Sequence, residues 1–138
     1  MEHWEELAPG GLRLLWDDTL FPPGTDSFLL SALPRLRPGL RVCDLGCGTG
    51  LVGFLLLQRQ RSLSLTGVDR EERAVALARR CAAENGLADR AVFETLDIRD
   101  LRGRLPAGGF DLAVANPPYF PRSRGLSPAD PARRQART

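Results

Sequence analysis

Residues 42–50 read Val-Cys-Asp-Leu-Gly-Cys-Gly-Thr-Gly, and the rest of the chain can be arranged around this stretch. The apolar and β-branched residues from Arg41 to Leu45 predict a buried strand. Three closely spaced glycines then free the backbone to turn, and the apolar run from Leu51 to Leu57 predicts a buried helix. Such a turn places backbone N–H groups and the positive end of a helix beside a ligand, which suits a carboxylate or a phosphate.

The acid at Asp44 distinguishes between these two ligands. Gly48, Gly50 and Gly53 also fit the Gly-x-Gly-x-x-Gly pattern of dinucleotide-binding loops, so the glycines alone leave the ligand open. A carboxylate two residues before Gly46 would repel a pyrophosphate. The acid therefore disfavours a dinucleotide, and the alternative to a ligand-binding loop is a structural glycine turn between a core strand and a core helix.

The composition indicates one soluble, globular domain. The chain has 138 residues, of which 43% are hydrophobic and 26% charged, and its net charge is +2. No apolar run approaches the length of a membrane span, and the acidic N-terminus is unlike a signal peptide, so we expect a cytoplasmic protein. Three cysteines and one histidine form no recognisable ligand set, so we expect a reducing compartment and no protein-bound metal.

The remaining pattern alternates strands with helices. Before the glycine loop we expect a short strand from Leu12 to Leu20 and a helix that ends near Leu33, with Thr25 or Asp26 as its N-cap. After the loop, the predicted strands are 62–69, 91–96 and 110–115, and the predicted helix is 71–85. Together with the strand at 41–45, this alternation predicts four parallel strands in an α/β sheet.

Two further acids stand at the ends of predicted strands. Asp69 ends the second strand and follows Gly50 by 19 residues, the spacing of an acid that accepts hydrogen bonds from a ribose diol. The alternative for Asp69 is a helix N-cap. Asp97 follows the third strand, where a plain strand-end residue is the alternative to a ligand contact.

The motif Asn116-Pro117-Pro118-Tyr119 follows the fourth strand. Its two prolines lock an extended backbone between an amide and an aromatic ring. The Asn116 side-chain oxygen and the Pro117 carbonyl can both accept hydrogens from an –NH₂ group, while Tyr119 can stack on the planar group that bears it. The motif therefore predicts an acceptor site for an amine conjugated to a π-system, and the alternative is a proline turn with a stacking tyrosine.

Asp44 followed by Gly-x-Gly-x-Gly, with Asn-Pro-Pro-Tyr downstream, resembles the motifs of class I S-adenosylmethionine-dependent methyltransferases. The resemblance extends from Leu12 to about Arg137. It implies a Rossmann-like, doubly wound α/β sheet, S-adenosyl-L-methionine as cofactor, S-adenosyl-L-homocysteine as product, and no metal. The cofactor-binding residues that it implies are Asp44 at the methionine end, Asp69 at the ribose, Asp97 near the adenine amine, and Gly46, Gly48, Gly50 and Asn116.

Residues 23–30, Pro-Gly-Thr-Asp-Ser-Phe-Leu-Leu, narrow the resemblance. This segment looks like the one ahead of the glycine loop in bacterial adenine methyltransferases of valine tRNA, which implies that Thr25 and Asp26 line the cofactor pocket. The implied reaction is methyl transfer to the exocyclic amine of adenine in RNA, and in particular tRNA, with Asn116, Pro117 and Tyr119 as catalytic residues. The alternatives are a protein-glutamine N-methyltransferase acting on release factors, a non-catalytic cofactor-binding fragment and a dinucleotide-binding domain.

The end of the chain departs from the family pattern. A class I domain has seven strands in the order 3-2-1-4-5-7-6, whereas four can be identified before Thr138, so we expect an incomplete sheet. Residues 121–138 carry five arginines against one acid, and the expected RNA contacts are Arg122, Arg124, Arg133 and Arg134. The expected segments are a mobile lead-in (1–11), a strand and helix over the cofactor pocket (12–40), a Rossmann-like core (41–120) and a flexible arginine- and proline-rich segment (121–138).

Overall fold

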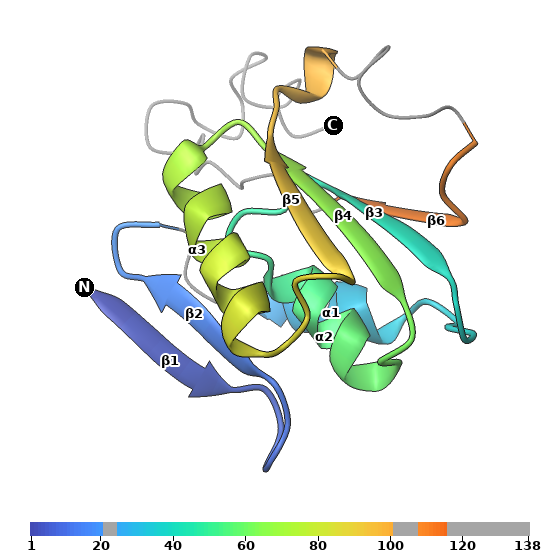
Figure 1. Cartoon of the computed structure of the whole chain (residues 1–138), viewed down its shortest axis with the longest axis horizontal. Coiled ribbons are helices and arrows are strands. Elements are labelled where there is room, and N and C mark those ends of the chain that lie inside the picture. Colours follow the sequence, from blue (N-terminus) through green and yellow to red (C-terminus); the bar gives the residue numbers. More distant parts are fainter. Residues whose placement is uncertain (21–24, 101–107, 116–138) are drawn as a thin grey trace, which may run out of the picture.

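Four parallel strands form the central sheet, in the order β5-β4-β3-β6, and an antiparallel hairpin precedes them (Figure 1). This computed structural model describes residues 1–20, 25–100 and 108–115. The elements are β1 (Glu2–Glu6), β2 (Arg13–Asp17), α1 (Thr25–Ala32), β3 (Arg41–Leu45), α2 (Leu51–Arg59), β4 (Ser64–Asp69), α3 (Glu72–Glu84), β5 (Ala91–Thr95), the 3₁₀ turn η1 (Ile98–Asp100) and β6 (Leu112–Ala115).

The sheet confirms the α/β architecture predicted from the sequence. β3 lies at its centre, because it pairs in parallel with β4 on one side and with β6 on the other. The crossovers through α2 and α3 lead in the same direction across the sheet, so right-handed connections place both helices on one face (Figure 1). Neighbouring residues of β5 show the difference between the faces: Phe93 is 2% exposed, whereas Val92 is 46% exposed.

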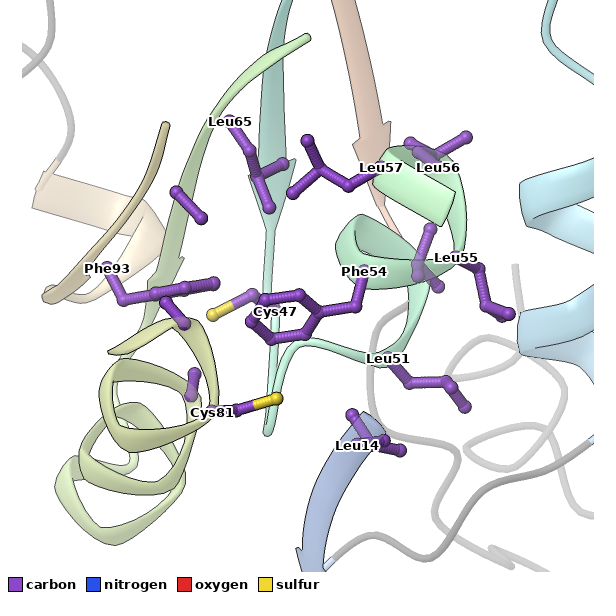
Figure 2. Close-up of a cluster of buried hydrophobic side chains, with 14 of the residues drawn as sticks. Leu14, Cys47, Leu51, Phe54, Leu55, Leu56, Leu57, Leu65, Cys81 and Phe93 are labelled. Carbon is purple, nitrogen blue, oxygen red and sulfur yellow. The ribbon is translucent and has the colours of Figure 1, made fainter. Parts of the chain in front are cut away.

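Helix α2 is buried along its first seven residues, from Leu51 to Leu57, because it packs against α1 on one side and against β4 and β5 of the sheet on the other. Phe54 meets Phe93 of β5 with ring centroids 5.6 Å apart, and Figure 2 shows both rings in the cluster that joins the helix to the strands. A side chain at Gly53 would collide with Leu65 of β4, so this glycine lets the helix approach the sheet closely. Each fully buried apolar side chain contributes about 1.5–3 kcal/mol, and the cluster therefore fixes α2 on the sheet.

The N-terminal hairpin corrects the expectation of a mobile lead-in at residues 1–11. β1 pairs with β2 along its whole length. Cross-strand contacts hold the pair: the His3 ring stacks on Trp16 with centroids 4.4 Å apart, and the Arg13 guanidinium lies 4.8 Å from the centre of the Trp4 ring. The side chains of β1 are mostly exposed, so the strand has no apolar pattern of its own that the sequence could reveal.

Asn85, which follows α3, occupies the free edge of β2. Its side-chain oxygen accepts the N–H of Arg13 at 2.9 Å, and its amide group donates to the Arg13 carbonyl at 2.7 Å. One side-chain amide thus makes the two hydrogen bonds that a neighbouring strand would make. Gln58 of α2 adds a third, because its Oε1 accepts the N–H of Leu12 at 2.7 Å.

Replacing Asn85 with alanine is expected to destabilise the protein by about 1–3 kcal/mol, because the Arg13 N–H loses its acceptor and the Arg13 carbonyl keeps only the weak Cys81 thiol donor. Urea unfolding followed by circular dichroism measures this change. Asn85→Asp tests the donor separately, since a carboxylate keeps the acceptor for the Arg13 N–H and puts a charged oxygen opposite the carbonyls of Arg13 and Cys81. We expect aspartate also to destabilise the protein at neutral pH, and equal stability of the alanine variant and the parent would contradict this role of Asn85.

Candidate functional site

The carboxyl ends of β3, β4 and β5 lie at one edge of the sheet, and three acids stand there. Asp44 is the last but one residue of β3, Asp69 is the last residue of β4, and Asp97 follows β5 by two residues. In parallel α/β sheets, ligands bind at this edge. The candidate site therefore consists of these acids and the glycine loop, residues 46–50, that follows β3.

The end of β4 holds the glycine loop in place. The carbonyl of Val68 accepts the N–H groups of Gly46 and Cys47 at 2.8 and 2.9 Å. The Asp69 carboxylate accepts the N–H of the next residue, Gly48, at 2.8 Å. Three consecutive N–H groups of the loop are therefore committed to the neighbouring strand before any ligand is bound.

These bonds change which donors the loop can offer. The sequence predicted that its N–H groups face a ligand, but those of Gly46, Gly48 and Gly50 donate to protein acceptors, the last to the Cys47 carbonyl at 2.9 Å. The N–H of Thr49 has no acceptor among the described residues, and the first N–H groups of α2 have none within the helix. An anionic ligand group would therefore be held by Thr49 and the start of α2.

Gly50 and Gly67 show two different reasons why the loop and its neighbouring strand need glycine. Gly50 has a φ of 94°, a conformation that residues with side chains rarely adopt. A Cβ at Gly67 of β4 would lie 2.6 Å from the Phe93 ring and 3.0 Å from the Cys47 Cβ. The loop can therefore lie directly against β4 only because Gly67 has no side chain, a role that the sequence analysis did not identify.

Asp44 is the residue of the site whose environment is least favourable for a charge. It is 1% exposed, and neither carboxylate oxygen makes a hydrogen bond of ordinary geometry with the described residues. Burial and the negative charge of Asp69 raise the pKa of Asp44 from 3.8 to about 7, and the nearby N–H of Gly53 in α2 offsets them only in part. A buried, unpaired carboxylate costs stability, and a cation bound beside it would remove that cost.

Asp69 is 8% exposed and accepts two backbone hydrogen bonds. Its Oδ2 accepts the N–H of Gly48 and its Oδ1 accepts the N–H of Glu71, both at 2.8 Å. The N-cap of α3 is Glu71, whose side chain accepts the N–H of Arg73 at 3.2 Å, so Asp69 is not the capping residue. Each carboxylate oxygen has a second lone pair, which leaves acceptor capacity for a ligand hydroxyl.

Asp97 is paired with Arg99, a partner that the sequence analysis did not identify. The Arg99 guanidinium donates to both oxygens of Asp97, with a shortest distance of 2.7 Å, and the Arg99 N–H donates to Oδ1 at 2.9 Å. These bonds lower the pKa of Asp97 from 3.8 to about 2. Between the two residues, Ile98 is 46% exposed, and its Cδ1 would lie 3.9 Å from a Cβ placed on Gly46. The edge of the site at β5 thus combines an ionised acid with an exposed apolar side chain.

The family model described as methyltransferase small domain matches residues 21–125. The chain belongs to this family. A tRNA1(Val) (adenine(37)-N6)-methyltransferase of Citrobacter koseri is similar to this methyltransferase small domain, with 35% identity over 115 residues that make up 83% of this chain and 46% of the relative. The chain thus spans about half the length of the curated relatives that it matches.

Two solved structures resemble this methyltransferase small domain in fold and sequence. TrmN from Thermus thermophilus has 28% sequence identity and a TM-score of 0.59, covering 71% of this chain and 29% of that one. A SAM-dependent methyltransferase from Geobacter sulfurreducens, in complex with S-adenosyl-L-homocysteine, has 32% identity and a TM-score of 0.51, covering 67% of this chain and 36% of that one. The sheet is therefore the Rossmann-like sheet of class I methyltransferases, as the sequence predicted.

Part of the predicted site lies outside the described residues. This holds for Asn116, Pro117, Tyr119, Arg122, Arg124, Arg133 and Arg134. Thr25 and Asp26 belong to the first turn of α1 and not to its cap, and their side chains also lie outside the described part. β6 ends at Ala115, directly before Asn116 in the sequence, and Ala115 pairs with Leu45 at the last position of β3.

The described part of this methyltransferase small domain has neither a metal-binding cluster nor a membrane-spanning helix. Residues 1–20, 25–100 and 108–115 contain no group of three or more His, Cys, Asp or Glu side chains that could hold a metal ion. Within the same ranges, no helix is both long and apolar enough to cross a membrane.

Proposed function

We propose that the chain binds S-adenosyl-L-methionine and is the cofactor-binding part of an enzyme that methylates the exocyclic amine of an adenine in tRNA. The observation that carries the proposal is the Asp44 carboxylate, which is 1% exposed and makes no hydrogen bond of ordinary geometry with the described residues. The cofactor carries an ammonium group, and a buried carboxylate next to a glycine loop is complementary to it.

The other residues of the site also fit this cofactor. The cofactor's own carboxylate suits the N–H of Thr49 and the positive N-terminus of α2. Asp69 would accept hydrogen bonds from the ribose, and Asp97 would accept one from the adenine amine, since both acids retain lone pairs beside their present partners. The relative of Geobacter sulfurreducens, whose structure contains S-adenosyl-L-homocysteine, supports this assignment.

When bound, the cofactor supplies a methyl group on a positively charged sulfur. The residues proposed to act on the acceptor are Asn116, Pro117 and Tyr119, which follow β6 in the sequence. β6 itself ends at the same edge of the sheet as β3, which leads into the glycine loop. Acceptor atoms on Asn116 and Pro117 would hold both hydrogens of the amine, and Tyr119 would stack on the base. The nitrogen would gain a bond to the methyl carbon as the carbon–sulfur bond breaks, and the resulting cationic amine would then lose one proton to water.

The tRNA substrate is proposed from the curated relatives, which are named as tRNA1(Val) adenine methyltransferases. The arginines at 122, 124, 133 and 134 follow directly on the acceptor motif, where phosphates next to an extruded adenine would pass. A tRNA substrate also implies a cytoplasmic location. The glutamine side chain of a release factor is the competing acceptor, because its amide likewise bears an –NH₂ group conjugated to a π-system.

Binding and transfer should be measured separately. Calorimetry with S-adenosyl-L-homocysteine is expected to show one site per chain. Transfer of a radioactive methyl group from S-adenosyl-L-methionine to unmodified tRNA, followed by nucleoside digestion, is expected to give N6-methyladenosine. A release-factor protein offered in the same assay should remain unlabelled. Absence of binding would overturn the cofactor assignment, and label in the protein instead of the tRNA would overturn the substrate.

A further inference from the structure

Asp69 is tied to three elements of the site, which is more than a ribose-binding acid requires. Its Oδ2 accepts the N–H of Gly48 in the glycine loop, and its Oδ1 accepts the N–H of Glu71 before α3, both at 2.8 Å. Its main-chain carbonyl accepts the N–H of Leu96 after β5, also at 2.8 Å. The residue therefore links the loops that follow β3, β4 and β5.

The bond to Gly48 is the one side-chain bond in the attachment of the loop to β4 among the described residues. The two preceding N–H groups donate to the main-chain carbonyl of Val68, which any residue at that position would provide. The bond to Gly48 is buried, so without the carboxylate this N–H would lose its partner away from water. The conformation of the loop around Gly48 thus depends on the identity of residue 69.

We propose that Asp69 is a positioning residue: its carboxylate holds the glycine loop in the ligand-binding conformation before the cofactor arrives, in addition to contacting the ribose. The first role rests on the bonds within the protein, and the second rests on the proposed function. Binding of the ribose and binding of the amino-acid end of the ligand are then coupled. The Asp69 carboxylate contacts the ribose, and it also fixes the loop that holds the amino-acid end. A fixed loop lowers the ordering cost of binding.

Amide hydrogen exchange of the unliganded 138-residue chain, followed by NMR, tests the first role without any ligand. In the parent, the N–H of Gly48 is expected to exchange more slowly than that of Thr49, which has no acceptor among the described residues. Asp69→Ala should accelerate exchange at Gly48 by about ten- to hundredfold and leave the buried amide of Leu56 in α2 unchanged.

Asp97→Asn is the matched control for this experiment. Asp97 is also an acid at the end of a strand, but its hydrogen bonds go to Arg99 in its own turn and not to the loop. Exchange at Gly48 should therefore stay at the parent value. The proposal is overturned if Gly48 exchanges as fast as Thr49 in the parent, a comparison that needs no variant, or if Asp69→Ala leaves Gly48 unchanged.

Two ligands test the coupling. S-adenosyl-L-homocysteine carries the adenosine and the amino-acid end, whereas 5′-methylthioadenosine carries the adenosine without the amino-acid end. If Asp69 also positions the loop, Asp69→Ala should lower the affinity for S-adenosyl-L-homocysteine about tenfold more than the affinity for 5′-methylthioadenosine. Equal losses of affinity would show that Asp69 only contacts the ribose. Failure of the parent to bind either ligand would contradict the proposed function, and the exchange experiment would still decide the positioning role.

Discussion

Replacing Asp44 with asparagine is expected to stabilise the unliganded protein above pH 7 and to weaken cofactor binding by at least about a hundredfold. Burial and the charge of Asp69 raise the pKa of Asp44 to about 7, from 3.8 for the unperturbed side chain. Between these two values the folded protein binds more protons than the unfolded chain, so its stability falls as the pH rises through this window. One pKa unit corresponds to about 1.4 kcal/mol, so the shift from 3.8 to about 7 lowers the free energy of unfolding by at most about 4 kcal/mol above pH 7.

The asparagine variant carries no charge and therefore avoids this loss. Urea unfolding at pH 5 and pH 8 gives the free energy of unfolding of both proteins. We expect the variant to gain stability relative to the parent as the pH rises. Asp111→Asn provides a control of opposite sign, because hydrogen bonds from Arg41 lower the pKa of Asp111 to about 2. That variant should be less stable than the parent at both pH values, since the ionised Asp111 carboxylate is stabilised by Arg41.

The raised pKa of Asp44 should also make ligand binding depend on its ionisation. A ligand ammonium beside Asp44 favours the ionised acid, so the parent should release a proton when it binds S-adenosyl-L-homocysteine at pH 6.5. Calorimetry in buffers of different ionisation enthalpy measures this proton, and Asp44→Asn should abolish it. Proton release that persists in the variant, or unchanged affinity for the ligand, would show that the ammonium is bound elsewhere.

Asn116→Ala is expected to lower kcat for tRNA methylation by about 10²–10³-fold and to leave the affinity for S-adenosyl-L-homocysteine within about twofold of the parent. A hydrogen-bond acceptor beside the amine matters most as the nitrogen becomes tetrahedral, which concerns the transition state and not the bound cofactor. Single-turnover methylation and calorimetry measure the two quantities separately. Asn116→Asp keeps an acceptor oxygen of the same reach and should retain more activity than alanine; equal losses of kcat and cofactor affinity would contradict the assignment.

The sequence predicted the parallel sheet well because each of its strands carries a local signal. The strand at Arg41–Leu45 was predicted with the bounds that it has, since an apolar run ends there in the glycine loop. The sheet strands near Ser64, Ala91 and Leu112 were predicted within two residues at each end. Strand β1 was missed, because the partners that stabilise it come from β2 and α3 and leave no pattern within residues 2–6.

The sequence predicted where Asp44 and Asp69 stand along the chain, but not the hydrogen bonds that Asp69 makes within the protein. Asp44 and Asp69 stand at the strand ends where the motif spacing put them. The spacing could not reveal that Asp69 uses both oxygens within the protein, since those bonds depend on how closely the loop approaches β4. That approach is set by Gly67, a glycine in the middle of a strand, and its position opposite Phe93 is a property of the sheet and not of the local sequence.

The attachment of the hairpin to α3 also creates a chemical reporter. Cys81 is fully buried under β2, where its thiol donates to the Arg13 carbonyl at 3.2 Å, and burial raises its pKa to about 11. An alkylating reagent needs the thiolate, so it reaches Cys81 only after the hairpin has moved away. If Cys81 is labelled faster than the buried Cys43 in β3, the difference measures how often the hairpin detaches while the sheet stays folded, and it shows whether the first strands of the chain open as a cooperative unit of their own.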